Sequence, residues 1–209
     1  MLSKPNPAST TLYSASQELE SHAVRFVMAH KSIEREVLEL KFDEMPEEII
    51  ELNPFQTLPT LFDRGMVLYD LSVVLEYLDE RFPFPPLLPV DPIDKAEKRL
   101  LLYRFTRAKG CWYELVDTVL NGNKKSADAA RKTLNGNFIE LLPLFAHKPY
   151  FKSDSMTLVD VCLAPILWRL NILEITLEEK ARPLRAYANR LFEKDGFHDS
   201  LTIAEKDLN

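Results

Sequence analysis

Cysteine, glycine and long apolar runs are scarce in this chain of 209 residues. With 2 cysteines and 5 glycines it is neither a disulfide scaffold nor a collagen-like repeat, and 46% hydrophobic residues exclude a disordered chain. The chain lacks the run of about 18 apolar residues that predicts a membrane span, and its first residues lack the apolar centre of a secretory signal. We therefore expect a soluble, cytoplasmic protein with no membrane contact.

The residues that usually bind metals show no metal-binding pattern. Cys111 and Cys162 lie far apart in apolar, helix-like runs, which favours core packing over catalysis or coordination. The four histidines also lack the spacing of a metal site: His22, His30, His147 and His198. We therefore expect no metal and no cofactor.

Positive charge is in short supply in the first part of the chain. Residues 1–85 hold 7 Lys and Arg against 15 Asp and Glu, whereas residues 86–209 hold 19 against 17. Because phosphate contacts need an excess of Lys and Arg, we expect no direct binding of nucleic acid. The acidic part either fits a basic protein partner or is a solvated surface that keeps the protein in solution.

The first 83 residues predict a small mixed sheet with helices, in the order β-α-β-α-β-β-α. Short β-branched and aromatic runs alternate with segments of helical spacing, and the last two strands form a hairpin around Gly65. The predicted elements are strand 10–13, helix 18–31, strand 37–40, a short helix opening at Pro46, strands 58–62 and 66–69, and helix 71–82.

A proline-rich stretch separates this first domain (1–83) from an all-helical second domain (94–209). Five prolines fall within residues 82–92, and because proline lacks an N–H donor we expect an extended linker at 84–93. Beyond it we expect one long helix at 95–120, a helix from Ser126 to about Leu142, a buried helix from Met156, a helix at 177–192 and a short helix after Phe197.

Three short motifs fit the layout of a known superfamily. Residues 58–61 (LPTL) open a predicted strand with a proline, residues 74–83 (VLEYLDERFP) end a helix, and residues 157–160 (TLVD) suit the start of a buried helix. With these motifs and its domain order, the chain resembles the glutathione-transferase superfamily along nearly its whole length. The resemblance implies that superfamily's fold, a thioredoxin-like α/β domain followed by an all-α domain.

Two of these motifs have structural roles. A proline at the start of a strand cannot donate to the ladder, so Pro59 belongs at an edge or a bend, and the resemblance implies that its peptide bond is cis. Thr157 and Asp160 can form a capping box, in which each side chain bonds the backbone N–H of the other residue. A buried helix needs such a cap because its first N–H groups would otherwise lack acceptors.

Further stretches resemble the stringent starvation protein A family, one branch of this superfamily. They are spread from end to end: residues 21–25 (SHAVR), 52–56 (LNPFQ), 79–87 (DERFPFPPL), 148–151 (KPYF), 163–170 (LAPILWRL) and 200–205 (SLTIAE). The resemblance implies a homodimer that associates with RNA polymerase holoenzyme during stress and has no glutathione-transferase activity.

The catalytic position of a glutathione transferase is poorly matched here. Such an enzyme stabilises a thiolate with a Tyr, Ser or Cys near the start of its first helix. Alignment on residues 24–25 places Glu18 where cysteine-type members carry the nucleophile, and a carboxylate there repels a thiolate. Tyr13 lies within a predicted strand, so Ser14 and Ser16 are the remaining candidates.

The carboxylate-binding position is also altered. The superfamily holds the γ-glutamyl carboxylate of glutathione with an acidic or amide residue followed by Ser, and the matching pair here is Asp70 and Leu71. Losing one hydrogen bond to a charged group costs about 1.5–3 kcal/mol, and Ser72 points about 100° further round the helix. We interpret Glu18, Leu58, Asp70 and Leu71 as a degenerate glutathione site, although the backbone at Leu58 could still bind glutathione weakly.

The proline-rich stretch offers a second kind of site. Pro83, Phe84, Pro85 and Pro86 hold an aromatic ring on a stiff loop, which suits a binding hot spot, but the ring could also pack between the two domains. The resemblance favours binding, because the starvation-protein family has a surface pocket at its Pro-X-Pro loop. Many members carry His in the middle, where this chain has Phe84, which argues against a role that needs imidazole chemistry.

These observations favour a non-catalytic regulator that binds RNA polymerase and alters transcription in the stress and starvation response. One alternative is an active glutathione S-transferase or thiol transferase that uses Ser14 or Ser16. Another is a binding module for a different protein partner. Glu18 and Leu71 argue against catalysis, whereas the family-like stretches argue for the polymerase.

Overall fold

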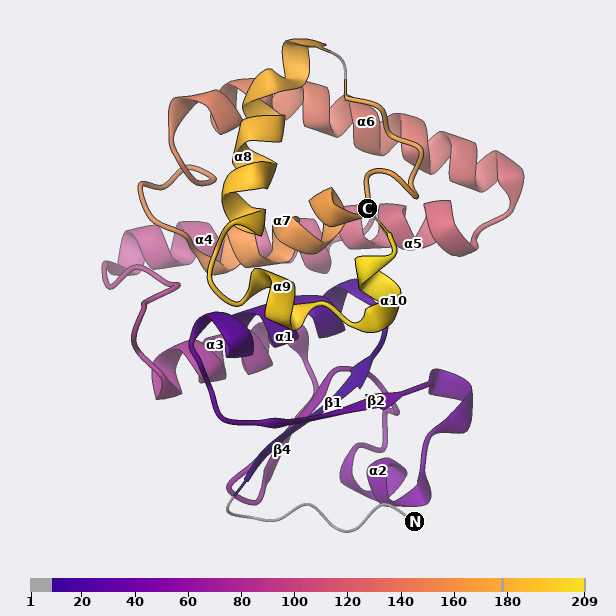
Figure 1. Cartoon of the computed structure of the whole chain (residues 1–209), viewed down its shortest axis with the longest axis vertical. Coiled ribbons are helices and arrows are strands. Elements are labelled where there is room, and N and C mark those ends of the chain that lie inside the picture. Colours follow the sequence, from indigo (N-terminus) through magenta and orange to yellow (C-terminus); the bar gives the residue numbers. More distant parts are fainter. Residues whose placement is uncertain (1–8, 178, 209) are drawn as a thin grey trace. The chain divides into compact units, whose positions relative to one another are not determined.

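The computed structural model describes residues 9–177 and 179–208 (Figure 1). Its contacts divide the chain into two compact units. The first combines the described residues up to Pro85 with Asp195–Lys206, and the second contains Pro86–Lys194 with Asp207 and Leu208. The sequence assigns residues 195–206 to the helical domain instead. The boundaries differ because this segment buries Phe197 and Glu205 within the first unit.

The first unit has the predicted order β-α-β-α-β-β-α, completed by two short helices of the C-terminal segment. Its strands form a sheet in the order β2-β1-β3-β4, in which β1 pairs in parallel with β2 and antiparallel with β3. The elements are β1 (Thr10–Ala15), α1 (Leu19–His30), β2 (Glu36–Leu40), η1 (Phe42–Glu44), α2 (Glu47–Leu52), β3 (Thr60–Asp63), β4 (Met66–Leu68), α3 (Leu71–Arg81), α9 (Phe197–Ser200) and α10 (Ile203–Lys206).

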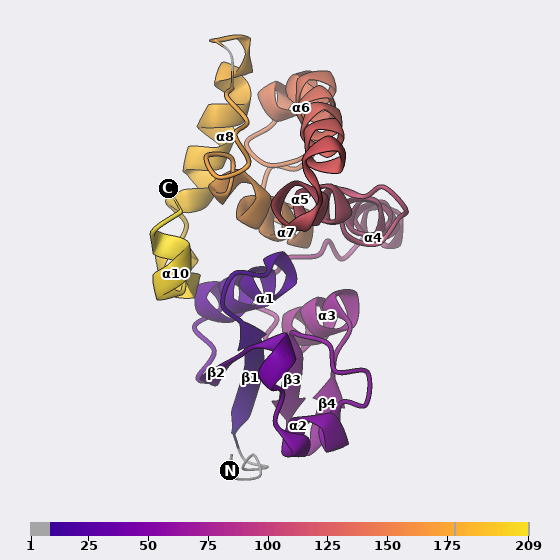
Figure 2. The same ribbon diagram turned by 90° about the vertical axis from the view of Figure 1, so that its right-hand side faces the viewer.

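Both faces of the central strand are covered, so all six residues of β1 are buried. Successive side chains of a strand point to opposite faces. Tyr13 packs with Ile49 of α2 on one face, so Leu12 points to the other, where α1 and α3 pack side by side (Figure 2). The chain then leaves β1 through a turn at residues 16–18 that leads directly into α1. This turn is where the sequence places the catalytic position.

Helices make up the second unit, as predicted. They are α4 (Pro92–Thr106), α5 (Trp112–Asn121), α6 (Lys124–His147), α7 (Leu158–Trp168), η2 (Glu179–Ala181) and α8 (Arg182–Phe192). Every residue of α7 is buried, which explains its almost unbroken apolar sequence. Within the described ranges, no helix is both long and apolar enough to cross a bilayer.

The predicted single helix at 95–120 is wrong, because α4 ends at Thr106 and α5 begins at Trp112. Gly110 in the intervening turn has a φ of +71°, a conformation that glycine adopts without steric cost. Cys111 is buried as expected, but it caps α5 rather than lying inside a helix, and its Sγ accepts from the N–H of Glu114 at 3.4 Å.

Two other predicted helix boundaries also differ. Asn123, and not Ser126, caps α6: its Oδ1 accepts from the N–H of Ser126 at 3.0 Å. The same helix continues past the expected end at Leu142, through Pro143, to His147. The segment predicted as a helix at 177–192 contains a separate 3-10 turn before α8 starts at Arg182. A side-chain cap sets the start of α6, and a 3-10 turn precedes the start of α8; apolar spacing alone indicates neither.

Candidate functional site

Glu18 lies immediately before α1, at the position where a catalytic nucleophile is expected. Its carboxylate accepts from the Ser21 hydroxyl (Oγ–Oε2 2.7 Å), and the same hydroxyl accepts from the N–H of Ala15 at 3.0 Å. Burial raises the pKa of Glu18 to about 7, although the bond from Ser21 opposes the shift. Near neutral pH the position therefore holds a carboxyl group that exchanges a proton. It offers no hydroxyl or thiol of its own.

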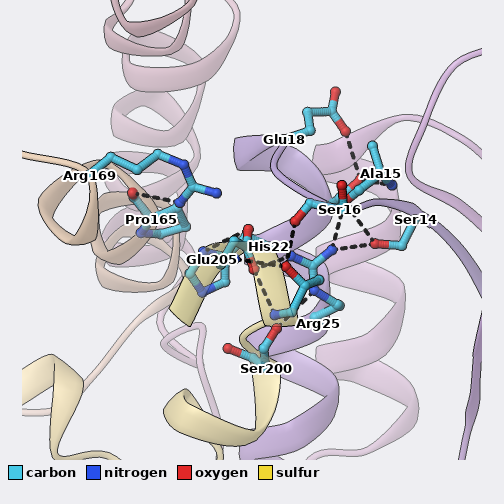
Figure 3. Close-up of polar contacts among 12 residues, drawn as sticks. Ser14, Ala15, Ser16, Glu18, His22, Arg25, Pro165, Arg169, Ser200 and Glu205 are labelled. Atoms are coloured by element: carbon cyan, nitrogen blue, oxygen red, sulfur yellow. Dashed lines mark hydrogen bonds and ion pairs between the residues drawn. The ribbon is translucent and has the colours of Figure 1, made fainter. Parts of the chain in front are cut away.

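The neighbouring hydroxyl of Ser14 is enclosed by the protein. Ser14 is fully buried, and the Arg25 guanidinium donates both to its Oγ and, at 2.9 Å, to the carbonyl of Ala15 (Figure 3). Ser16 is half-buried, and its carbonyl accepts from the hydroxyl of Thr202 at 2.8 Å. Of the two serines considered as nucleophiles, only Ser16 is therefore partly exposed.

Arg25 and Glu205 organise this turn, and the sequence analysis did not assign them a role. A second nitrogen of the Arg25 guanidinium lies 2.7 Å from the Glu205 carboxylate. The Nε of Arg25 donates to the carbonyl of Ser200 at 2.8 Å. Both charged groups are buried. The only sequence signal was that each lies in a family-like stretch, at residues 21–25 and 200–205. Nothing in local spacing indicated that the two stretches meet.

The second part of the degenerate site lies at the start of α3. Asp70 caps this helix, because its Oδ1 accepts from the N–H groups of Ser72 and Val73 at 2.9 and 3.2 Å. The Ser72 hydroxyl donates to the same oxygen at 2.5 Å, and Leu71 points into the core. The hydroxyl that could replace the missing serine is thus bonded to Asp70. The nearby Leu58–Pro59 peptide bond is cis, as the resemblance implies.

The proline loop, residues 82–86, contains the predicted partner-binding residues. Its Phe84 side chain is 81% exposed, and Pro83, Pro85 and Pro86 are exposed as well. A ring with that exposure contributes little to the core. Phe84 therefore lies exposed on the first unit, as the interpretation as a surface site requires.

The capping residues of α7 form a buried polar network. Thr157 and Asp160 form the predicted capping box, in which the Asp160 carboxylate accepts from the N–H of Thr157 at 2.7 Å. The same carboxylate also accepts from the Thr157 hydroxyl at 2.8 Å. It also accepts from the N–H of Phe151 at 2.8 Å and the hydroxyl of Tyr187 at 2.6 Å. Burial raises the pKa of Asp160, while these bonds oppose the shift. These contacts agree with the structural role expected of the pair. The described part of the chain contains no cluster of His, Cys, Asp and Glu suited to a metal.

Comparisons with known proteins agree with this architecture. The family described as glutathione S-transferase, N-terminal domain, matches residues 21–81, and the corresponding C-terminal domain matches residues 93–195. A stringent starvation protein A homolog of Coxiella burnetii is 42% identical, over 95% of this chain and 94% of that protein. The chain belongs to the stringent starvation protein A family. A second homolog of that name, from Haemophilus influenzae, is 37% identical over 91% of this chain and 89% of its own.

More distant relatives of this starvation protein A family member include enzymes by name. Glutathione S-transferase omega-1 of Sus scrofa is 26% identical over 71% of this chain and 62% of that protein. Solved structures share the fold: FzlA from C. crescentus has a TM-score of 0.82 at 21% identity, covering 97% of this chain and all of its own. A rice glutathione transferase in complex with glutathione has a TM-score of 0.82 at 23% identity, covering 96% and 94%.

Proposed function

We propose that this chain is a non-catalytic, cytoplasmic regulator that binds RNA polymerase holoenzyme as a homodimer and alters transcription under stress and starvation. The observation that carries the proposal is Phe84, an apolar ring left 81% exposed on a proline-flanked loop. Membership of the stringent starvation protein A family supports it, because the resemblance of the chain to that family implies polymerase association.

The glutathione position supports the non-catalytic part of the proposal. A carboxyl group at Glu18 repels a thiolate when ionised and cannot replace a nucleophile when protonated. Ser14 is enclosed, and Leu71 removes a donor for the glutathione carboxylate. The first two features weaken thiolate stabilisation, and Leu71 weakens the binding of glutathione.

The loop has the properties of a protein-binding hot spot. Burying a Phe side chain contributes about 1.5–3 kcal/mol, which corresponds to about 10- to 100-fold in affinity. Proline fixes φ, so little conformational freedom remains to be lost on binding. Because Phe84 has no imidazole, recognition here depends on apolar contact. The acid excess of residues 1–85 suits a basic surface around the complementary pocket of the partner.

For the homodimer, the surface that fits best is an exposed apolar row on α4. Ile93, Leu100 and Tyr103 are all exposed and lie seven and three residues apart, on one face of the helix. A second copy of the chain would cover this row. Light scattering should report a dimer for the wild type and a monomer for Leu100→Glu/Tyr103→Glu. A monomeric wild type would reject the homodimer, and a double variant that stays dimeric would remove α4 from the interface.

The polymerase proposal is tested by binding of purified holoenzyme to the immobilised protein. Phe84→Ala should weaken binding at least tenfold, on the order of one buried aromatic contact. Phe42→Ala is the matched control, because Phe42 is another exposed aromatic residue of the first unit but lies outside the loop. Equal binding by wild type and Phe84→Ala would remove the loop from the polymerase contact, and absence of binding by the wild type would reject the function.

An active transferase is the second candidate, favoured by the similarity to glutathione S-transferase omega-1 and by the partial exposure of Ser16. The purified protein should show no turnover of a chlorodinitroaromatic substrate with glutathione. Robust turnover that Ser16→Ala or Ser14→Ala abolishes would establish the enzyme and overturn the regulator.

A further inference from the structure

A buried lysine holds the proline loop from inside the first unit. Lys31 follows the last residue of α1, and its side chain is completely buried. Its Nζ lies 2.7 Å from Asp79 Oδ1 and donates to the carbonyls of Phe82 at 2.6 Å and Pro85 at 2.7 Å. An ammonium group has three donors and no acceptor, so these three oxygens satisfy it.

The Lys31 ammonium lies where two helices, α1 and α3, have their C-termini. Lys31 caps the C-terminus of α1 and Phe82 caps that of α3, where backbone carbonyls lack intrahelical donors and favour a cation. Asp79, in the last turn of α3, supplies the opposite charge. A buried ammonium is stable only with such partners, which makes this contact set selective for lysine. The planar guanidinium of an arginine would not match it.

The composition of the loop requires that the side chain holding its backbone be a hydrogen-bond donor. Pro83, Pro85 and Pro86 have no N–H, so the loop offers mainly carbonyl acceptors to the rest of the protein. Lys31 bonds one carbonyl before Phe84 and one after it in the chain. The backbone is thereby fixed on both sides of the exposed ring. The guanidinium of Arg81, 4.9 Å from the centre of the Phe82 ring, adds a contact on one side.

We propose that Lys31 is a positioning residue for partner binding, which holds the backbone on both sides of Phe84 so that the ring meets its partner in one orientation. The proposal rests on the function proposed for the loop. Lys31 acts only through the loop, since its own side chain is buried and cannot touch a partner. Its contribution is preorganisation, which raises affinity by reducing the freedom lost on binding.

The test places 4-fluorophenylalanine at position 84 and records its fluorine spectrum in wild type, Lys31→Met and Asp79→Asn. Wild type should give one resonance, and both substitutions should shift or broaden it. Glu205→Gln is the matched control, because it disturbs another buried ion pair of the first unit, the one with Arg25 of α1. It should leave the fluorine resonance in place. Spectra are taken below the melting transition of every variant. If Lys31→Met does not fold, Asp79→Asn alone is compared with wild type.

Binding of purified polymerase holoenzyme gives the second readout. Lys31→Met should weaken binding on the order of tenfold when Phe84 is present. In a protein that already carries Phe84→Ala, adding Lys31→Met should not weaken binding any more. An unchanged fluorine resonance in both loop variants would overturn the proposal, and so would an equal loss of affinity in both backgrounds. If Phe84→Ala binds like wild type, the function proposed for the loop fails. The fluorine spectra then still decide whether Lys31 orders the ring.

Discussion

The turn before α1 and the proline loop differ in how their side chains are used. In the turn, Arg25 bonds both Ser14 and Glu205, and all three side chains are buried. In the loop, the backbone bonds inward to Lys31 while Phe84 stays exposed. A site whose polar groups are already bonded within the protein has few left for a substrate. An apolar ring on a fixed backbone is available to a partner, so the comparison favours binding over catalysis.

Arg25→Met should give the largest loss of stability, because it removes the central side chain of the buried network in the turn before α1. The buried Glu205 carboxylate would lose its ion pair, and removing one partner of a buried pair costs about 3–5 kcal/mol. Urea denaturation at pH 7 measures the change. Arg104→Met, at an exposed position of α4, is the control and should cost less than about 0.5 kcal/mol. A loss below about 1 kcal/mol in Arg25→Met would show that the turn does not depend on this network.

Glu18→Gln should remove a pH dependence of stability. Folding raises the pKa of this carboxyl from its usual 4.5 to about 7, so the folded state holds the proton more tightly. The contribution of this group to stability therefore falls as pH rises from about 4.5 through 7 and levels off above about pH 8, with a total loss of about 1–3 kcal/mol. Relative to wild type, Glu18→Gln should gain that amount between pH 4 and pH 8 in urea denaturation. A difference that does not change with pH would show that Glu18 is ordinarily solvated.

Thr157→Ala should give a moderate loss of stability in the second unit, against which the effects in the first unit can be compared. The substitution removes the hydroxyl from the capping box of α7, which should cost about 0.5–2 kcal/mol. The denaturant midpoint should fall with an unchanged slope. An unchanged midpoint would mean that the cap does not stabilise the start of this helix.

Phe84→Ala should have the smallest effect on stability, less than about 0.5 kcal/mol, because an exposed ring contributes little to folding. Phe26→Ala, which truncates a fully buried ring of α1, should cost about 3–5 kcal/mol in the same thermal melts. A large loss in Phe84→Ala would mean that the ring packs against the protein, and the contrast between the two regions would disappear.

Local signals predicted the fold well and the helix boundaries less well. The mixed sheet followed from strand and helix spacing, and the capping box of Thr157 and Asp160 followed from side-chain chemistry. The break near Gly110 was missed, because the apolar spacing of α4 continues with little interruption into α5. The start of α6 was missed because Asn123 and Ser126 are both good capping residues, and spacing alone does not choose between them.

The sequence by itself determined the order of the elements, the proline-rich bend and the family, because these depend on residues close together in the chain. Only the tertiary structure decided that residues 195–206 complete the first unit and that Arg25 meets Glu205, 180 positions away. It also decided that Lys31 bonds the loop and that Phe84 remains exposed. Contacts of this kind form only when the chain folds back on itself, and no local pattern of residues indicates which distant groups will meet.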